Sequence, residues 1–302
     1  MLPPTRHRLI IAGCFAVAAT LWWLGGRWAG LVEAHAGLTL TMTPSSLVVT
    51  VGSLLPGAVV ALLAAAVAAW AGNPLAGVFV LAGSLAVVAG ASGPIDAFLR
   101  RADVPGAYLG LAAEALVWHA LVLGGVAMVG WVWQRTTARR RPALRPGEPL
   151  PPADEPGFEG LIAPLDLHAL YACAIAAAVA TPLTVVLLRS GEPAQVIGGL
   201  LIAFTAGGAV AYTTMPRVRC HLAVLAAPLL VAVGGYLWVY AGYADSAAVL
   251  AAWFNIDGSS PRDPRLPAVA LALPVFYASA GVTGVAMGIG LGQTIVRARR
   301  AV

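Results

Sequence analysis

Long apolar stretches, separated by short polar segments, follow one another along the whole chain of 302 residues. A helix that spans the hydrocarbon core of a bilayer needs about 20 consecutive, mostly apolar residues. Strands of a membrane barrel instead alternate polar and apolar residues over segments of about 10 residues. The pattern therefore predicts an all-α, polytopic transmembrane helix bundle, because lipid offers the backbone no hydrogen-bond partners. The expected helices cover residues 9–31, 48–71, 75–95, 107–133, 167–189, 195–215, 222–243 and 267–292.

Composition agrees with this class of protein. Only 10% of the residues are charged and 60% are hydrophobic, whereas a soluble domain carries about 25% charged residues. All 18 basic residues are arginine, which, with the abundant Ala, Gly, Val and Pro, indicates a high-GC bacterial genome and a bacterial plasma (inner) membrane. The net charge of +5 does not indicate a nucleic-acid partner, because the arginines flank apolar stretches that face the lipid bilayer.

The arginines also predict an orientation. Twelve of the 18 lie before the first stretch, after the fourth, between the sixth and seventh, and after the last, all on one side of the membrane. Because cytoplasmic loops carry the excess of arginine, both termini are expected in the cytoplasm. The first stretch is longer than the apolar region of a secretion signal, which favours an uncleaved anchor.

A basic and proline-rich segment at 135–165 divides the eight stretches into two groups of four. Such a composition is typical of a linker, so we expect one membrane half at 1–134, a cytoplasmic linker at 135–165 and a second membrane half at 166–302. The sequence GVAM at 125–128 recurs at 284–287. One interpretation is a duplication that gives two parallel four-helix repeats. The other is chance similarity in a chain rich in Ala, Gly, Val and Leu, and both interpretations stay open.

Two charged residues lie within apolar stretches, where charge is costly and often functional. Glu114 lies about 10 Å from the outer end of the fourth helix, counting about 1.5 Å per residue, and Arg27 lies near the outer end of the first. We hypothesise that they pair across the bundle. The favoured interpretation is a lock between helices, and the alternative is a gate or a proton-carrying carboxylate.

Three histidines are weak candidates for ligand binding. His119 points about 140° away from Glu114 around the same helix, and a hydrogen-bonded packing role is favoured over metal or haem ligation. His168 and His221 begin the fifth and seventh helices at the same depth, as a shared haem would require, but a helix end is also where any histidine avoids lipid. The three isolated cysteines show no metal-site spacing, so we expect no metal and no cofactor.

Small residues at every fourth position form one face of the last helix, at Ala280, Gly284, Gly288 and Gly292. Such faces let helix backbones approach closely. Packing within the bundle is the favoured interpretation, and a partner subunit on the Gly284, Gly288 and Gly292 face is the alternative.

Prolines and aromatic residues add local expectations. Four prolines are expected to kink helices from within, namely Pro56, Pro182, Pro228 and Pro274. Aromatic residues near the helix ends are typical of interfacial belts, among them Trp22, Trp28, Trp131, Tyr236, Tyr240 and Tyr243. Short interfacial helices are expected within 93–106 and over 246–255.

These observations favour a non-enzymatic integral membrane protein, either structural or a subunit of a membrane complex. A secondary transporter or permease for a small solute is the alternative, favoured by the kinked helices and the internal similarity. No nucleophile–base pair or ligand set can be assembled from the sequence, which weighs against an intramembrane enzyme.

Overall fold

The structure, a computed structural model, describes residues 4–28, 39–40, 47–93, 95, 104–140, 163–216, 218, 220–255 and 265–300. Every regular element within these ranges is a helix, so the all-α prediction is confirmed. The long helices are α1 (Pro4–Trp28), α2 (Leu47–Ala71), α3 (Pro74–Gly90), α5 (Val104–Arg140), α6 (Leu167–Leu187), α7 (Pro193–Thr214), α9 (Ala227–Gly242) and α12 (Val282–Arg300). The short ones are α8 (His221–Leu225), α10 (Ser246–Phe254), α11 (Pro274–Phe276), a 3-10 turn η2 (Ala268–Ala270) and a π-helical turn η3 (Tyr277–Gly281).

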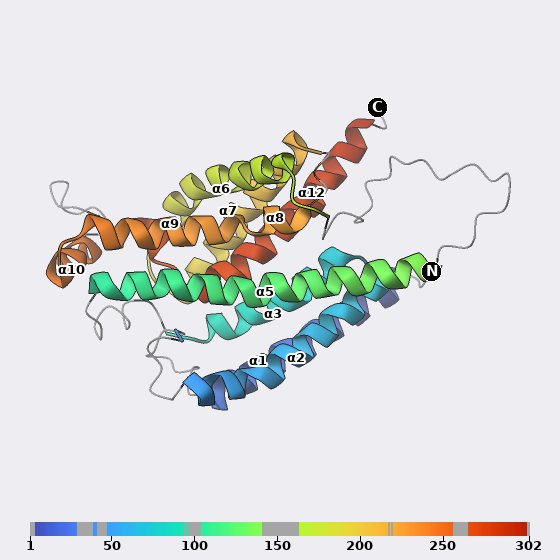
Figure 1. The fold of residues 1–302 in the computed structure, drawn as a ribbon, viewed down its shortest axis with the longest axis horizontal. Coiled ribbons are helices and arrows are strands. Elements are labelled where there is room, and N and C mark those ends of the chain that lie inside the picture. The colour runs from blue at the N-terminus through green and yellow to red at the C-terminus, as the bar shows by residue number, and fades with distance from the viewer. Residues whose placement is uncertain are drawn as a thin grey trace.

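Seven helical segments of the described chain are long and apolar enough to cross a membrane. The remaining predicted span, α3, has 17 residues and is therefore only about 25 Å long. Most of α3 is buried, because it packs against α1, α2, α5 and α12 in the middle of the bundle. In Figure 1, the start of α1 and the end of α12 lie at one end of the bundle and α10 lies at the other.

Helix packing follows a similar scheme in the two parts of the chain. In the first part α1 lies along α2, and in the second α6 lies along α7. The two parts meet where α5 packs on α9 and where α3 packs on α12 (Figure 1). Among the described helices, α7 and α12 form the most extensive pair, and the corresponding pair in the first part, α2 with α5, is much less extensive.

The last span differs from its prediction. A single helix was expected over 267–292, but the described chain is irregular around η2 and the continuous helix begins only at Pro274. Proline is favoured in the first turn of a helix, because the N–H that it lacks would have no partner there. Pro228 likewise opens α9 after a break at Ala226. The prediction of a proline inside a continuous helix is therefore wrong at Pro274, whereas Pro228 lies at an interruption of the 221–242 span and Pro56 and Pro182 lie inside helices.

The glycine face of α12 is covered by α7 of the same chain. A Cβ atom added at Gly284 would lie 2.7 Å from the carbonyl oxygen of Leu201, and one added at Gly292 would lie 3.0 Å from the Cβ of Tyr212. Gly288 approaches the α7 backbone still more closely. A partner subunit cannot occupy this face while α7 does, so the partner alternative is wrong and the packing interpretation holds.

Helix α5 extends beyond its expected end. It continues to Arg140, so the first part of the predicted linker is helical, and Arg135 stacks its guanidinium 4.1 Å from the Trp131 ring centroid. Residues 141–162 lie outside the described part of the chain, as does most of the interfacial helix expected within 93–106. The helix expected over 246–255 is present as α10, which Asp245 caps by accepting a hydrogen bond from the Ala248 N–H at 2.8 Å.

Candidate functional site

The irregular segment before the last helix is held inside the bundle by tyrosines. Residues 269–273 are almost wholly buried, although their backbone is not in a continuous helix. At membrane depth such carbonyl groups need protein partners, because an unsatisfied one costs several kcal/mol. Three hydroxyls from α5, α9 and η3 supply them: Tyr108 donates to Ala270 O at 3.5 Å, Tyr236 to Ala272 O at 2.5 Å, and Tyr277 to Val269 O at 2.5 Å.

The three tyrosine rings also form one aromatic cluster. Tyr236 lies between the other two, with ring centroids 6.1 Å from Tyr108 and 6.4 Å from Tyr277. Tyr236 was expected in an interfacial belt, and that expectation is wrong because its ring is buried in this cluster. Tyr240 on the same helix, Trp28 and Trp131 are exposed as belt residues would be, whereas Trp22 is buried. The sequence did contain a sign that Tyr236 is buried, because this residue lies about 9 Å inside the end of α9 and thus away from the membrane surface.

Glu114 is enclosed on α5, where the indole Nε1–H of Trp118 donates to its Oε1 at 2.9 Å. Arg27 is exposed, and its guanidinium lies 5.4 Å from the centroid of the Trp23 ring on its own helix. The structure therefore does not bring Arg27 and Glu114 together. A long arginine side chain near a helix end reaches toward the interface and stacks on a neighbouring aromatic ring instead. The partner that sequence reasoning missed, Trp118, follows Glu114 at the i+4 spacing that places two side chains on one helix face.

His119 is fully buried. Its Nδ1 lies 2.8 Å from the carbonyl oxygen of Ala115, and a carbonyl only accepts, so Nδ1 carries the hydrogen and donates. The Nε2 atom has no hydrogen-bond partner within the described residues. This geometry fits a packing histidine bonded to its own helix.

The other two histidines lie in different environments. His168 is exposed in the first turn of α6, whereas His221 is buried at the start of α8, with its ring stacked on Tyr212 at a centroid distance of 6.0 Å. Across the described ranges, no group of three or more His, Cys, Asp or Glu side chains is placed to hold a metal ion.

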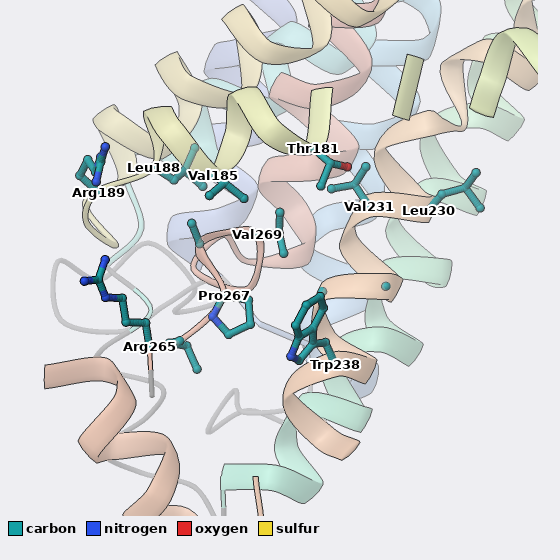
Figure 2. Close-up of a pocket in the computed structure, with 14 residues that line it drawn as sticks. Thr181, Val185, Leu188, Arg189, Leu230, Val231, Trp238, Arg265, Pro267 and Val269 are labelled. Carbon is teal, nitrogen blue, oxygen red and sulfur yellow. The ribbon is translucent and has the colours of Figure 1, made fainter. Parts of the chain in front are cut away.

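A cavity of about 550 Å³ lies between α6 and α9, away from Glu114 and His119. We call it the α6–α9 groove, and residues 265–269 form its floor. Its walls are mainly apolar and include Thr181, Val185, Arg189, Leu230, Gly234, Trp238 and Arg265. Figure 2 shows Arg189 and Arg265 gathered at one end of the groove, with Thr181 and Leu230 toward the other.

The fold and these sites define a multi-pass helical membrane protein with an apolar groove that has two arginines at its end. No protein-family model, curated protein or solved structure matches the chain.

Proposed function

We propose that this protein is a non-enzymatic integral membrane protein that serves as a structural unit or as a subunit of a membrane complex. One observation carries the proposal: the polar side chains deep in α5 are sealed in protein. Glu114 is 3% exposed and His119 is 0% exposed, and neither lines the α6–α9 groove.

A transporter instead needs polar side chains that are open to water or to the substrate. Ionisable groups that serve substrate or proton pathways in membrane proteins face a water-filled cavity or the substrate path. Glu114 instead accepts a hydrogen bond from a neighbouring indole, and His119 bonds its own helix. Both groups thus bond within α5 and are shielded by the surrounding protein, which supports a structural role.

A secondary transporter or permease for a small solute is the second candidate, and the irregular segment around η2 favours it. Discontinuous helices form the substrate sites of many transporters, because their unwound carbonyl groups coordinate ions. Here tyrosine hydroxyls already occupy the carbonyl oxygens of Val269, Ala270 and Ala272. The segment is therefore better suited to a fixed structural role than to ion coordination.

The arrangement in the membrane belongs to the same proposal. We place both termini in the cytoplasm of a bacterial cell, with the protein in the plasma membrane, because arginine is enriched on the side that carries the termini. Two parallel four-helix halves, 1–134 and 166–302, are supported by the matching pairs α1 with α2 and α6 with α7. The pair α2 with α5 is less extensive than the pair α7 with α12, and under this proposal the halves have diverged there.

The test combines a flux measurement with complex isolation. Purified protein in liposomes is assayed for uptake of a panel of small labelled solutes and for proton leak, and native membranes are solubilised mildly and resolved by size. We expect no saturable flux and a membrane complex larger than the single chain. Saturable flux that Glu114→Gln abolishes, in a variant that still folds, would overturn the proposal in favour of transport.

A further inference from the structure

The α6–α9 groove opens sideways. Val185 on α6 is 48% exposed, and Leu230 and Trp238 on α9 are 54% and 67% exposed. All three lie on helices long and apolar enough to span the membrane, so their exposed surfaces meet hydrocarbon rather than water. An occupant can therefore enter the groove from the lipid phase.

Two neighbouring glycines shape the interior of the groove. A Cβ atom added at Gly235 would lie 2.8 Å from Cγ2 of Val269, so this glycine lets the floor approach α9. A Cβ added at Gly234 would have no atom within 4 Å, so this position borders open space. The volume of about 550 Å³ lies within the range of small-molecule sites, about 300–1,000 Å³.

Positive charge is concentrated at one end. Arg189 follows the end of α6, and its Nε–H donates to Val186 O at 2.9 Å, which fixes the side chain while the Nη groups remain as donors. Arg265 begins the floor, and the Tyr243 hydroxyl donates to its backbone carbonyl at 2.7 Å. Among the described residues that line the groove there is no acidic side chain, so within this part of the chain no carboxylate competes with an anion for the two guanidinium groups.

We propose that the α6–α9 groove binds a membrane phospholipid with an anionic headgroup. An acyl chain lies along Val185, Leu230 and Gly234, and the phosphate accepts hydrogen bonds from Arg189 and Arg265. Apolar walls account for the chain, and paired guanidinium groups match a phosphate because arginine binds it in a fork of charge-assisted hydrogen bonds. The arginine end of the groove follows the end of α6, which points toward the end of the bundle where α10 is found (Figure 1).

The experiment measures lipid binding to the purified full chain after delipidation. The probes are phosphatidylglycerol, phosphatidylcholine with the same acyl chains, and inorganic phosphate, with bound lipid counted by native mass spectrometry and affinity measured with a fluorescent analogue. We expect one tightly held phosphatidylglycerol. Phosphatidylcholine should bind about tenfold more weakly, and phosphate alone should not compete, because it gains nothing from the apolar walls.

Two sets of variants locate the site. Gly234→Phe fills the groove, and its matched control is Gly124→Phe, since Gly124 is also exposed on a spanning helix with nothing within 4 Å of an added Cβ. Arg189→Gln with Arg265→Gln removes the charged end, and its control is Arg27→Gln with Arg135→Gln, two exposed arginines elsewhere. We expect each groove variant to weaken phosphatidylglycerol binding about tenfold or more, and the controls to bind normally.

Three results would overturn the proposal: equal affinity for the two phospholipids, undiminished binding to both groove variants, or phosphate competing as well as the lipid does. If Gly234→Phe fails to elute as a single species in size exclusion, the arginine pair decides the outcome, because surface arginines are replaced there without a change in packing.

Discussion

The repeated sequence GVAM occurs on two helices that use it differently. On α5, a Cβ atom added at Gly125 would meet the end of a side chain, Cδ2 of Leu81, at 2.7 Å. On α12, the same atom at Gly284 would meet main chain, the carbonyl oxygen of Leu201, also at 2.7 Å. A leucine side chain can rotate away, whereas a helix backbone must move as a whole. The same glycine of the motif therefore tolerates a larger side chain better on α5 than on α12.

The surroundings of the two helices explain this difference. Of the most apolar part of each span, 39% is buried in α5 and 83% in the last span. Helix α5 is continuous over 37 residues and turns part of its surface to lipid. The last span begins with an irregular segment and a π-helical turn, lies in the centre, and meets the α7 backbone along its glycines. A short motif thus predicts a helix face with small residues. How closely another helix packs against that face depends on the neighbouring helix.

The largest effect is expected from Gly288→Val. The new side chain would overlap the main chain of α7, including the amide nitrogen of Ala209 at 2.7 Å from the Cβ position. Overpacking of this kind costs about 3 kcal/mol or more, so the yield of folded protein in detergent should collapse. Fluorescence-detected size exclusion measures that yield, and a variant with the wild-type elution profile would contradict the close α7–α12 contact.

A direct comparison of the two motif copies comes next. Gly284→Ala should destabilise the protein by about 1–3 kcal/mol, because backbone cannot yield. Gly125→Ala should change stability by less than about 1 kcal/mol, because Leu81 can shift and alanine favours helix. Unfolding in mixed micelles with increasing dodecyl sulfate gives both values. Equal losses of unfolding free energy in the two variants would show that both copies of the motif are packed equally tightly, which would contradict the comparison.

Removal of a tyrosine hydroxyl should have a smaller effect. Tyr277→Phe leaves the carbonyl of Val269 without its donor and should cost about 1–2 kcal/mol, with the irregular segment becoming easier to open. Hydrogen exchange at residues 265–273 reports that opening. Tyr240→Phe is the control, because Tyr240 is exposed on the same helix as Tyr236, and equal protection in Tyr277→Phe and wild type would count against the tyrosine cluster as a clamp.

The smallest effect is expected from Arg27→Gln. Among the described residues, the exposed guanidinium contacts the Trp23 ring, so the free energy of unfolding should change by less than about 1 kcal/mol. A buried ion pair with Glu114 would instead make the loss about 3–5 kcal/mol. Dodecyl sulfate unfolding of Arg27→Gln therefore distinguishes the structure from the pairing hypothesis.

Much of the fold follows from apolar length alone, including α2, α6 and α7, whose ends lie close to the predicted ones. The break before Pro274 does not follow from apolar length, because residues 267–273 are as apolar as the interior of a membrane helix. Their conformation is explained by the tyrosine hydroxyls that bond their carbonyl groups. Glu114 was singled out correctly as deep, but its partner was sought across the bundle although Trp118 lay one turn away. The groove could not be predicted, since it arises where the floor around Val269 meets α6 and α9.

The central claim is that the deep polar residues of α5 are sealed while Arg189 is accessible at the end of the α6–α9 groove. Labelling of single cysteines by a water-soluble maleimide tests it in intact membranes opened to both sides, after the native cysteines Cys14, Cys173 and Cys220 are replaced by alanine. We predict rapid labelling of Arg189→Cys and labelling of Glu114→Cys only after denaturation. Labelling of native Glu114→Cys as fast as that of Arg189→Cys would reveal a water-filled path to α5 and contradict the account.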